Sequence, residues 1–322
     1  MLTISRYTAA DEEVWNAFVE TSKNGTFLFD RRYMDYHRDR FTDHSLMVWL
    51  DHRLIALLPA DIKGNTLRSH GGLTYGGLVT DRHMTTELAL ETFNGINSFL
   101  ASTQQIDKVV YKPTPWIYHD VPAEEDLYAL TNVCHARLSA REVSTAVSLP
   151  ASIKISEQRR RGRNKAMRNG VEIKESQDLE SFWTMLRDNL ESRHHVAPVH
   201  TAEELELLAR RFPRHIHLFT ALKGEKLLGG TLVFDCGKVI HTQYIASTEE
   251  GKKLGALDLL FSTLVSEQYA DHDYLDFGKS TEHQGTWLNK GLIHQKEGFG
   301  GRAVCYDTYE WDIKQQILVM RY

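Results

Sequence analysis

The stretch KVIHTQYIASTEEGKKLGALDLLF, residues 238–261, joins a strand pattern to a helix pattern through a glycine-containing turn. Residues 239–247 are rich in β-branched and aromatic side chains, which favour a strand. From Ala256 onward, apolar side chains recur at helical spacing, at Leu257, Leu260, Phe261, Leu264 and Val265. The stretch therefore predicts a strand, a turn and a helix in direct succession.

The predicted helix start at Gly255 and Ala256 is a candidate anion site. A helix amino terminus offers unpaired backbone amides and a partial positive charge, both of which stabilise a phosphate. Lys252 would add electrostatic attraction. The alternative is an ordinary loop–helix junction whose lysines are solvated.

A second stretch, YLDFGKSTEHQGTWLNKG (274–291), begins as an apolar strand and ends in a cluster of ionisable residues. An amine must lose a proton to attack an ester or thioester, so a carboxylate or imidazole near the reacting atoms would help. Asp276, Glu282 and His283 all qualify by residue type. In the alternative interpretation, Asp276 caps the following turn and the other two are solvated.

Composition indicates an ordinary globular protein without strong charge bias. The chain has 322 residues, 42% of them hydrophobic and 25% charged, with a net charge of −5. Three isolated cysteines and the lack of a CxxC pair favour a reducing compartment and no zinc site. We see no signal peptide and no apolar run of roughly 20 residues. These features predict a cytoplasmic protein without membrane insertion.

Two halves of the chain repeat the same order of elements. In each, strand patterns separated by glycine or Asp-His turns precede a helix, which spans residues 85–102 in the first half and 256–270 in the second. The repeat predicts an α/β protein made by duplication, with two tandem domains that each contain a mixed sheet flanked by helices. We place the boundary near Pro150, which gives domains at 1–150 and 151–322.

Further helices are expected at residues 9–23 and 31–41, and strands across 45–79 and 217–247. The segment RRRGRNKAMRNG within 154–170 is helical in pattern and strongly basic. Its residues Arg160 and Arg163 are candidates for binding a phosphate-bearing substrate. A solvated basic helix is the alternative.

The residues QYIAS (243–247) and GKKLGALDLLF (251–261) resemble the acyl-donor-binding segment of GCN5-related N-acetyltransferases (GNATs). LNKGLIHQKEGFGG (288–301) is similar to the last helix of that fold, before a final strand VCYDTYEW. Two such halves, with a basic segment leading into the second, resemble the Fem-type branch of acyl- and aminoacyltransferases, which includes peptidoglycan branching enzymes that use aminoacyl-tRNA.

This resemblance implies a transferase that moves an acyl or aminoacyl group from acyl-CoA or aminoacyl-tRNA to an amine, for which a cell-wall precursor is one candidate. The partners would then be a small-molecule or precursor amine acceptor and, if the donor is aminoacyl-tRNA, tRNA. This chain departs from the family's pattern for the acetyl-CoA-binding loop. Lys252, Gly255 and Leu257 occupy the positions of a Gln or Arg, a Gly and a small residue. Fem-type proteins lack the intact loop.

Residue roles follow from the same resemblance. The strand 244–247 would separate from its neighbour and hold the acyl carbonyl on a backbone amide. The predicted catalytic residues are Asp276, Lys296 and Tyr244. The predicted donor site comprises Ile245, Lys252, Gly255, Ala256 and Asn289. The predicted acceptor or substrate contacts are Arg160, Arg163, Gln243, Lys279 and Ser280.

Each of these roles has a structural alternative. Tyr244 could be a core aromatic residue, and Lys296 could complement the carboxyl end of its helix. An acetyl-CoA-dependent N-acetyltransferase acting on a small amine is the alternative enzyme, and a catalytically silent precursor-binding module is the alternative outside enzymes. The run HHVAPVH (194–200) offers no acidic partner at ligand spacing, so we predict no metal site.

Overall fold

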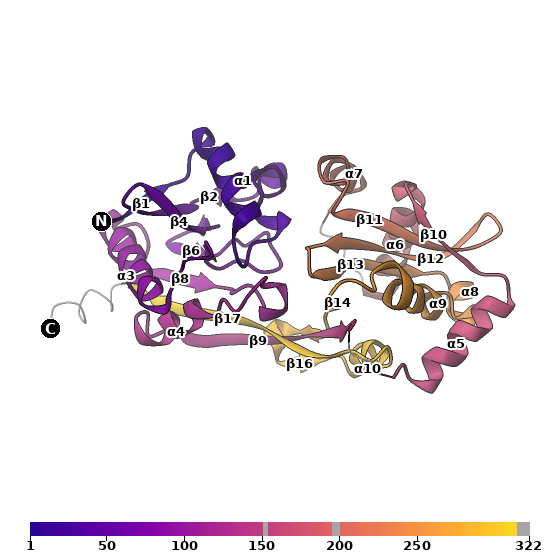
Figure 1. Ribbon diagram of the computed structural model, residues 1–322. Coiled ribbons are helices and arrows are strands. Elements are labelled where there is room, and N and C mark those ends of the chain that lie inside the picture. The colour runs from indigo at the N-terminus through magenta and orange to yellow at the C-terminus, as the bar shows by residue number, and fades with distance from the viewer. Residues whose placement is uncertain (151–153, 195–199, 314–322) are drawn as a thin grey trace. The chain divides into compact units, whose positions relative to one another are not determined.

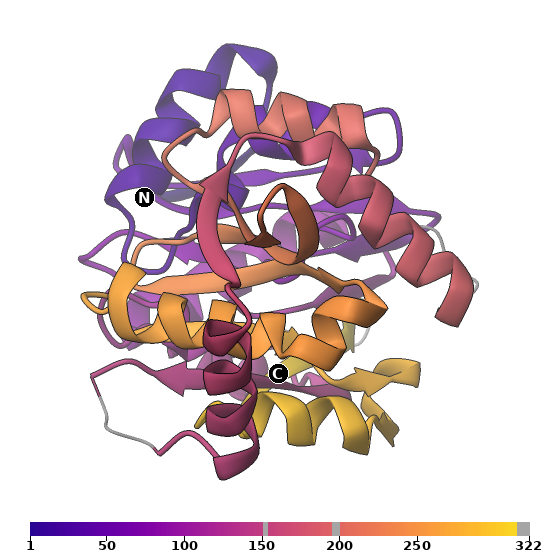
Figure 2. The same ribbon diagram turned by 90° about the vertical axis from the view of Figure 1, so that its right-hand side faces the viewer.

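The computed structural model describes residues 1–150, 154–194 and 200–313, shown in two views in Figures 1 and 2. Most of the HHVAPVH segment lies outside these residues. The chain divides into two compact units, neither of which is one continuous segment. Unit 1 comprises Met1–Glu142, His283–Thr286 and the chain from Cys305 onward, and unit 2 comprises Val143–Glu282 and Trp287–Val304. The division thus falls after Glu142 rather than near Pro150, and residues 305–313 belong to the first unit.

Unit 1 contains two sheets and four α-helices. Its strands are β1 (Leu2–Arg6), β2 (Thr42–Asp43), β3 (Leu46–Leu50), β4 (Arg53–Leu58), β5 (Asp61–Lys63), β6 (Thr66–Arg68), β7 (Val79–Thr80) and β8 (Lys108–Tyr111), with half of β9 (Arg137–Ser148) and most of β17 (Arg302–Asp312). Its helices are α1 (Glu12–Thr21), α2 (Arg31–Met34), α3 (Thr86–Thr103) and α4 (Glu125–Asn132). The parallel pair β6–β8 makes its larger sheet mixed.

Unit 2 contains a mixed sheet in the order β10-β11-β12-β13-β14-β9, of which only β13 and β14 are parallel to each other, and a separate sheet of β15 and β16. Its strands are β10 (Glu172–Ser176), β11 (Ile216–Lys223), β12 (Lys226–Asp235), β13 (Val239–Ser247), β14 (Tyr274–Lys279), β15 (Thr281–Glu282) and β16 (Trp287–Leu288). Its helices are α5 (Glu157–Arg168), α6 (Leu179–His194), α7 (Ala202–Arg211), α8 (Glu249–Leu254), α9 (Ala256–Thr263) and α10 (Lys290–Glu297). In Figure 1, α9 lies in front of this sheet and α6 behind it.

The predicted α/β class, with mixed sheets flanked by helices, is confirmed. The strand, turn and helix predicted across residues 238–261 are β13, α8 and α9, although the turn contains a short helix that we did not predict. Thr248 accepts a hydrogen bond from the Gly251 amide and so caps α8. The helix expected at 31–41 is wrong beyond Met34, because the chain continues there as a 3-10 turn.

The parallel neighbours β13 and β14 separate soon after they meet. Only three residue pairs join them, and the last is His241 with Asp276. Each strand carries a bulge just beyond this point. The pairing of β13 with β12 shifts its register between Leu232 and Val233 of β12, so that Gln243 is the extra residue of β13. On β14 the shift opposite β9 includes Gly278, whose φ of 72° lies in the left-handed region. Because bulges bend a strand locally, the two edges diverge and leave a gap.

The start of α9 is covered by α5. Gly255 ends α8 and begins α9 with a φ of 77°, and a Cβ atom there would overlap the backbone of Gly162 on α5. Arg159 of α5 binds Asp258 of α9 across an N–O distance of 2.6 Å and lies 5.5 Å from the ring centre of Phe299. The basic helix is therefore fastened to the helix that follows the glycine turn.

We expect Gly255→Ala to destabilise the protein by about 3 kcal/mol or more, because the new methyl group adds backbone overlap to an unfavourable φ. Gly224→Ala is the matched control, since Gly224 also has a positive φ, of 59°, but would place its Cβ in open space. We expect this control to cost only about 1–2 kcal/mol. Urea unfolding would measure both, and equal losses would contradict the close contact between α5 and α9.

Candidate active site

A cavity of about 350 Å³ lies in unit 2 where β13 and β14 part. Both strands and helices from both faces of the sheet line it, and we call it the interstrand cavity. Its lining residues include Leu186, Asn189 and Leu190 of α6, Ile245, Ala246 and Ser247 of β13, Phe277 of β14, and Lys252, Leu257, Phe261, Leu292, Gln295, Lys296 and Phe299 of the helical side. Most of these side chains are apolar, and two carry positive charge.

Lys296 is the buried cation of this cavity, with only 5% of the residue exposed. Its Nζ atom donates to the carbonyl oxygens of Gly278 at 2.8 Å and Lys279 at 2.9 Å, just beyond the bulge of β14. Burial lowers the pKa of Lys296 to about 8, although the nearby Asp276 carboxylate acts to raise it. An ammonium has three N–H donors, so one remains for a ligand oxygen in the cavity.

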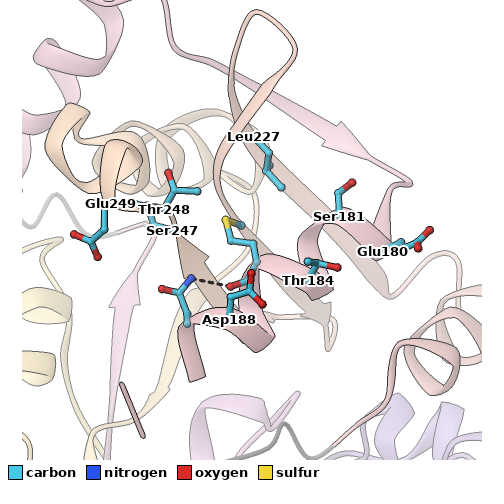
Figure 3. A pocket seen from close by; sticks show the side chains of 10 residues that line it. Glu180, Ser181, Thr184, Asp188, Leu227, Ser247, Thr248 and Glu249 are labelled. Carbon is cyan, nitrogen blue, oxygen red and sulfur yellow. Dashed lines mark hydrogen bonds between the residues drawn. The ribbon is translucent and has the colours of Figure 1, made fainter. Parts of the chain in front are cut away.

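A larger cavity of about 750 Å³ adjoins the first, and both are lined by Asn189 and Ser247. We call it the α6 cavity. Figure 3 shows residues of α6 on one side of it and Ser247, Thr248 and Glu249 on the other. The Asn189 side chain donates to the Met185 carbonyl at 2.9 Å. The carboxylates of Glu180, Asp188 and Glu249 are among its lining groups. The sequence analysis did not single out α6, which supplies most of this wall.

Asp276 does not face either cavity. Its side chain has no exposed surface, and it accepts hydrogen bonds from the Ser144 hydroxyl and from the Gly278 amide at 2.9 Å. Its other oxygen lies 3.2 Å from Nδ1 of His241. A carboxylate held in this way cannot take a proton directly from a substrate, so the direct catalytic role that we predicted for Asp276 does not fit its position.

Tyr244 and Gln243 lie at the bulge of β13. The Tyr244 hydroxyl is 2.6 Å from Nδ1 of His200, and its ring packs edge-on against Trp183 of α6. Burial raises the pKa of Tyr244. Neither residue is among those that line the two cavities, whereas Ile245 lines the interstrand cavity. The predicted catalytic role of Tyr244 stays a prediction.

Of the residues in the predicted phosphate site, Lys252 reaches a cavity, whereas Gly255 and Ala256 do not. Lys252 lines the interstrand cavity and pairs with Glu249 at 2.6 Å. Gly255 and Ala256 are buried, and α5 covers them through Gly162. A covered helix start offers no surface to a phosphate, so the donor contacts that we predicted for Gly255 and Ala256 do not fit their position. Sequence alone could not reveal this cover, because α5 precedes α9 by about 90 residues of chain.

Asn289, Lys279 and Ser280 surround the start of α10. Asn289 caps this helix by accepting from the Leu292 amide at 3.1 Å, which is a structural role. Lys279 is exposed at the end of β14, and Ser280 is buried with a hydroxyl that has no hydrogen-bond partner among the described residues. Their predicted contact with the acceptor is not tested by this geometry.

The basic face of α5 divides into paired and solvated cations. Arg160 is exposed and bonds to Glu157, while the Nε atom of Arg163 lies 3.4 Å from the side-chain oxygen of Asn164. Neither Arg160 nor Arg163 lines the cavities. Within the described residues, no group of three or more His, Cys, Asp or Glu side chains could hold a metal ion. None of the helices described is long and apolar enough to cross a membrane.

Comparison with known proteins identifies the domain that carries these cavities. Residues 154–284 match the acetyltransferase (GNAT) domain family. No curated protein matches the chain in sequence. The matched segment covers β10 to β14 and α5 to α9, and so includes most of the interstrand cavity.

Solved structures share the fold over nearly the whole chain. FemX aligns with 12% identity over 99% of both chains, at a TM-score of 0.69. The C-terminal domain of a putative lysylphosphatidylglycerol synthetase from Agrobacterium fabrum aligns with 11% identity over 97% of this chain and 95% of the other, at 0.60. L-PGS from Bacillus licheniformis aligns with 15% identity over 98% and 97%, at 0.59. The chain therefore has a Fem-like GNAT fold, and its matched domain is that of an N-acyltransferase.

Buried Lys296 predicts a pH dependence of stability. In the unfolded chain this lysine keeps its proton up to about pH 10.5, while in the folded chain it loses the proton near pH 8. Between these values unfolding takes up a proton, so the folded state becomes relatively more stable as the pH rises. We expect the free energy of unfolding of the wild type, minus that of Lys296→Met, to increase by roughly 3 kcal/mol across this range.

Urea unfolding at several pH values would measure this difference. Lys290→Met is the matched control, because Lys290 is exposed on the same helix. The free energy of unfolding of this control should change with pH in the same way as that of the wild type. If Lys296→Met also followed the wild type at every pH, a lowered pKa at this position would be contradicted.

Proposed function

We propose that this N-acyltransferase binds the acyl end of its donor in the interstrand cavity and transfers the acyl or aminoacyl group to an amine. The observation that carries the proposal is the gap beyond His241 and Asp276, with the Lys296 ammonium at its wall. Beyond His241, β13 has no strand partner on its β14 side among the described residues. Its backbone edge can therefore hold a carbonyl group of a ligand, as a strand would.

Lys296 supplies the positive charge that acyl transfer requires. When an amine attacks an ester or thioester carbonyl, negative charge develops on the carbonyl oxygen, and a fixed cation in a desolvated site stabilises it. Two backbone carbonyls hold the ammonium in place, so little reorganisation is needed when the charge appears. With a pKa near 8, the same lysine is also able to give a proton to the departing thiolate or alkoxide.

The covered start of α9 bears on the donor. In the acetyl-CoA-dependent members of the fold, that helix start presents amides to the coenzyme A diphosphate, and here Gly162 occupies the space in front of Gly255. This cover favours an aminoacyl ester carried on tRNA over acyl-CoA. FemX and the lysylphosphatidylglycerol synthetases, which share the fold, bear names consistent with aminoacyl transfer. Arg160 and Arg163 remain candidates for contact with donor phosphates, and a cell-wall precursor remains a candidate acceptor.

The test is a transfer assay with two donor arms, acetyl-CoA and tRNA charged with labelled amino acids, against a panel of amino acids, amino sugars and cell-wall precursors. We expect transfer in the tRNA arm and a loss of about 10²–10³-fold in kcat for Lys296→Met, the cost typical of one oxyanion donor. Lys290→Met should transfer at the wild-type rate. Full activity of Lys296→Met would contradict the proposal, and transfer from acetyl-CoA alone would reject the tRNA donor.

A further inference from the structure

His241 and Asp276 form a buried pair at the closed end of the gap between β13 and β14. They are the last residues that pair across these strands, and Nδ1 of His241 lies 3.2 Å from Oδ2 of Asp276. Paired residues on neighbouring strands project from the same face of a sheet. On β12, Leu232 pairs with Tyr244 and Phe234 pairs with His241. Leu232 and Phe234 are two residues apart and share a face, so Tyr244 lies on the same face as His241. This face is the one covered by α6, since Tyr244 packs against Trp183.

Only one member of the pair has accessible surface. Asp276 is fully enclosed, whereas 11% of the His241 side chain is exposed. The carboxylate is also held from three directions, by the Ser144 hydroxyl, the Gly278 amide and the His241 ring. Its orientation is therefore fixed, and any proton that passes between a ligand and this pair must pass through the imidazole.

The carboxylate determines the tautomer of the ring. An ionised carboxylate only accepts hydrogen bonds, so Nδ1 of His241 carries the proton that it donates to Asp276. In a neutral imidazole the other nitrogen, Nε2, is then the proton acceptor. The same arrangement of carboxylate and imidazole prepares histidine as a base in other enzymes.

Gly278 brings this imidazole close to the Lys296 ammonium. Lys296 donates to the Gly278 carbonyl at 2.8 Å. A Cβ atom on Gly278 would lie 3.4 Å from Cε1 and 4.0 Å from Nε2 of His241, so the ring rests against the glycine. A proton acceptor and a cation thus flank one residue of the β14 bulge, where the strands part.

We propose that His241 is the general base of the acyl transfer and that Asp276 is its positioning residue, an inference that rests on the proposed function. The amine nitrogen forms a bond to the acyl carbon while Nε2 of His241 takes one N–H proton. The tetrahedral intermediate then collapses, the bond from carbon to the donor oxygen or sulfur breaks, and the donor leaves with a proton from Lys296. The imidazolium returns its proton to solvent or to neutral Lys296.

A purely structural role for the pair makes a different prediction. The unit contains other histidine–carboxylate pairs, and in one of them Nε2 of His272 lies 3.3 Å from Asp235. His272 precedes β14, at the opposite end of that strand from the bulge. If such pairs only stabilise the fold, removal of either histidine should affect transfer in the same way, through stability alone. The variant His272→Gln is therefore the matched control for His241→Gln.

The first measurement needs no substrate. Two-bond ¹⁵N–¹H spectra of protein labelled at histidine report the tautomer of each ring, and the signals that vanish in His241→Gln identify His241. We expect the Nδ1–H tautomer in the wild type. In Asp276→Asn the amide can donate to Nδ1 and so favour the Nε2–H tautomer, in a side chain of nearly unchanged shape. An Nε2–H tautomer in the wild type, or an unchanged tautomer in Asp276→Asn, would overturn the proposal.

The second measurement is transfer with the donor and acceptor identified by the panel above. We expect kcat to fall about 10²–10⁴-fold in His241→Gln and Asp276→Asn, the range typical of a lost general base, with the KM for the donor changed little. In His241→Gly, added imidazole should restore part of the rate. His272→Gln should keep the wild-type kcat. A kcat of His241→Gln within a few-fold of wild type would reject the base role.

The two proposals fail in distinguishable ways. A wild type that transfers no acyl group from either donor would overturn the proposed function and the base role with it, while the spectra would still decide whether Asp276 sets the tautomer. Transfer that depends on Lys296 but not on His241 would leave the proposed function in place and overturn this inference alone.

Discussion

The structure of unit 2 depends on two parallel strands that stay paired for only three residues. Backbone hydrogen bonds would favour a longer ladder, so something must hold β13 and β14 apart. A bulge on each strand does this, with Gln243 as the extra residue of β13 and Gly278 within the bulge of β14. Outside the gap, each strand is paired with a different neighbour, β12 or β9, so the backbone on those sides is satisfied. The interstrand cavity follows from this arrangement, and so does the placement of Lys296, whose ammonium binds carbonyls that the bulge exposes.

Two buried charged side chains lie beside the gap. The Lys296 ammonium and the Asp276 carboxylate are both buried, and each has hydrogen-bond partners that compensate for lost solvation. The carboxylate is enclosed, while the ammonium reaches a cavity. The helix start nearby, which in related acetyltransferases binds a diphosphate, is occupied by a neighbouring helix. Positive charge at the interstrand cavity is thus provided by the Lys252 and Lys296 side chains rather than by backbone amides at α9.

The sequence predicted the fold well because its signals are local and periodic. The strand, glycine turn and helix at residues 238–261 could be identified from residue spacing and resemblance, and Ile245, Lys252 and Lys296 do line the cavity. What the sequence could not provide were contacts between distant segments. Ser144 donates a hydrogen bond to the buried Asp276 carboxylate, and the Gly162 backbone covers Gly255. Both partners are distant in the sequence from the residues that they contact. His241 was overlooked because a lone histidine inside a strand has no pattern of its own.

Interleaving of the two units has a consequence for biosynthesis. Strand β17 pairs with β8 of unit 1, for example Tyr309 with Tyr111, and yet the segment from α5 to α10 separates the two strands in the chain. During synthesis, unit 1 therefore lacks this strand until the segment from α5 to α10 has been made. Unit 2, in turn, uses the end of β9, which is made before the rest of it. A cut between β9 and β17 would leave β8 without its β17 partner, and an exposed strand edge of this kind favours aggregation.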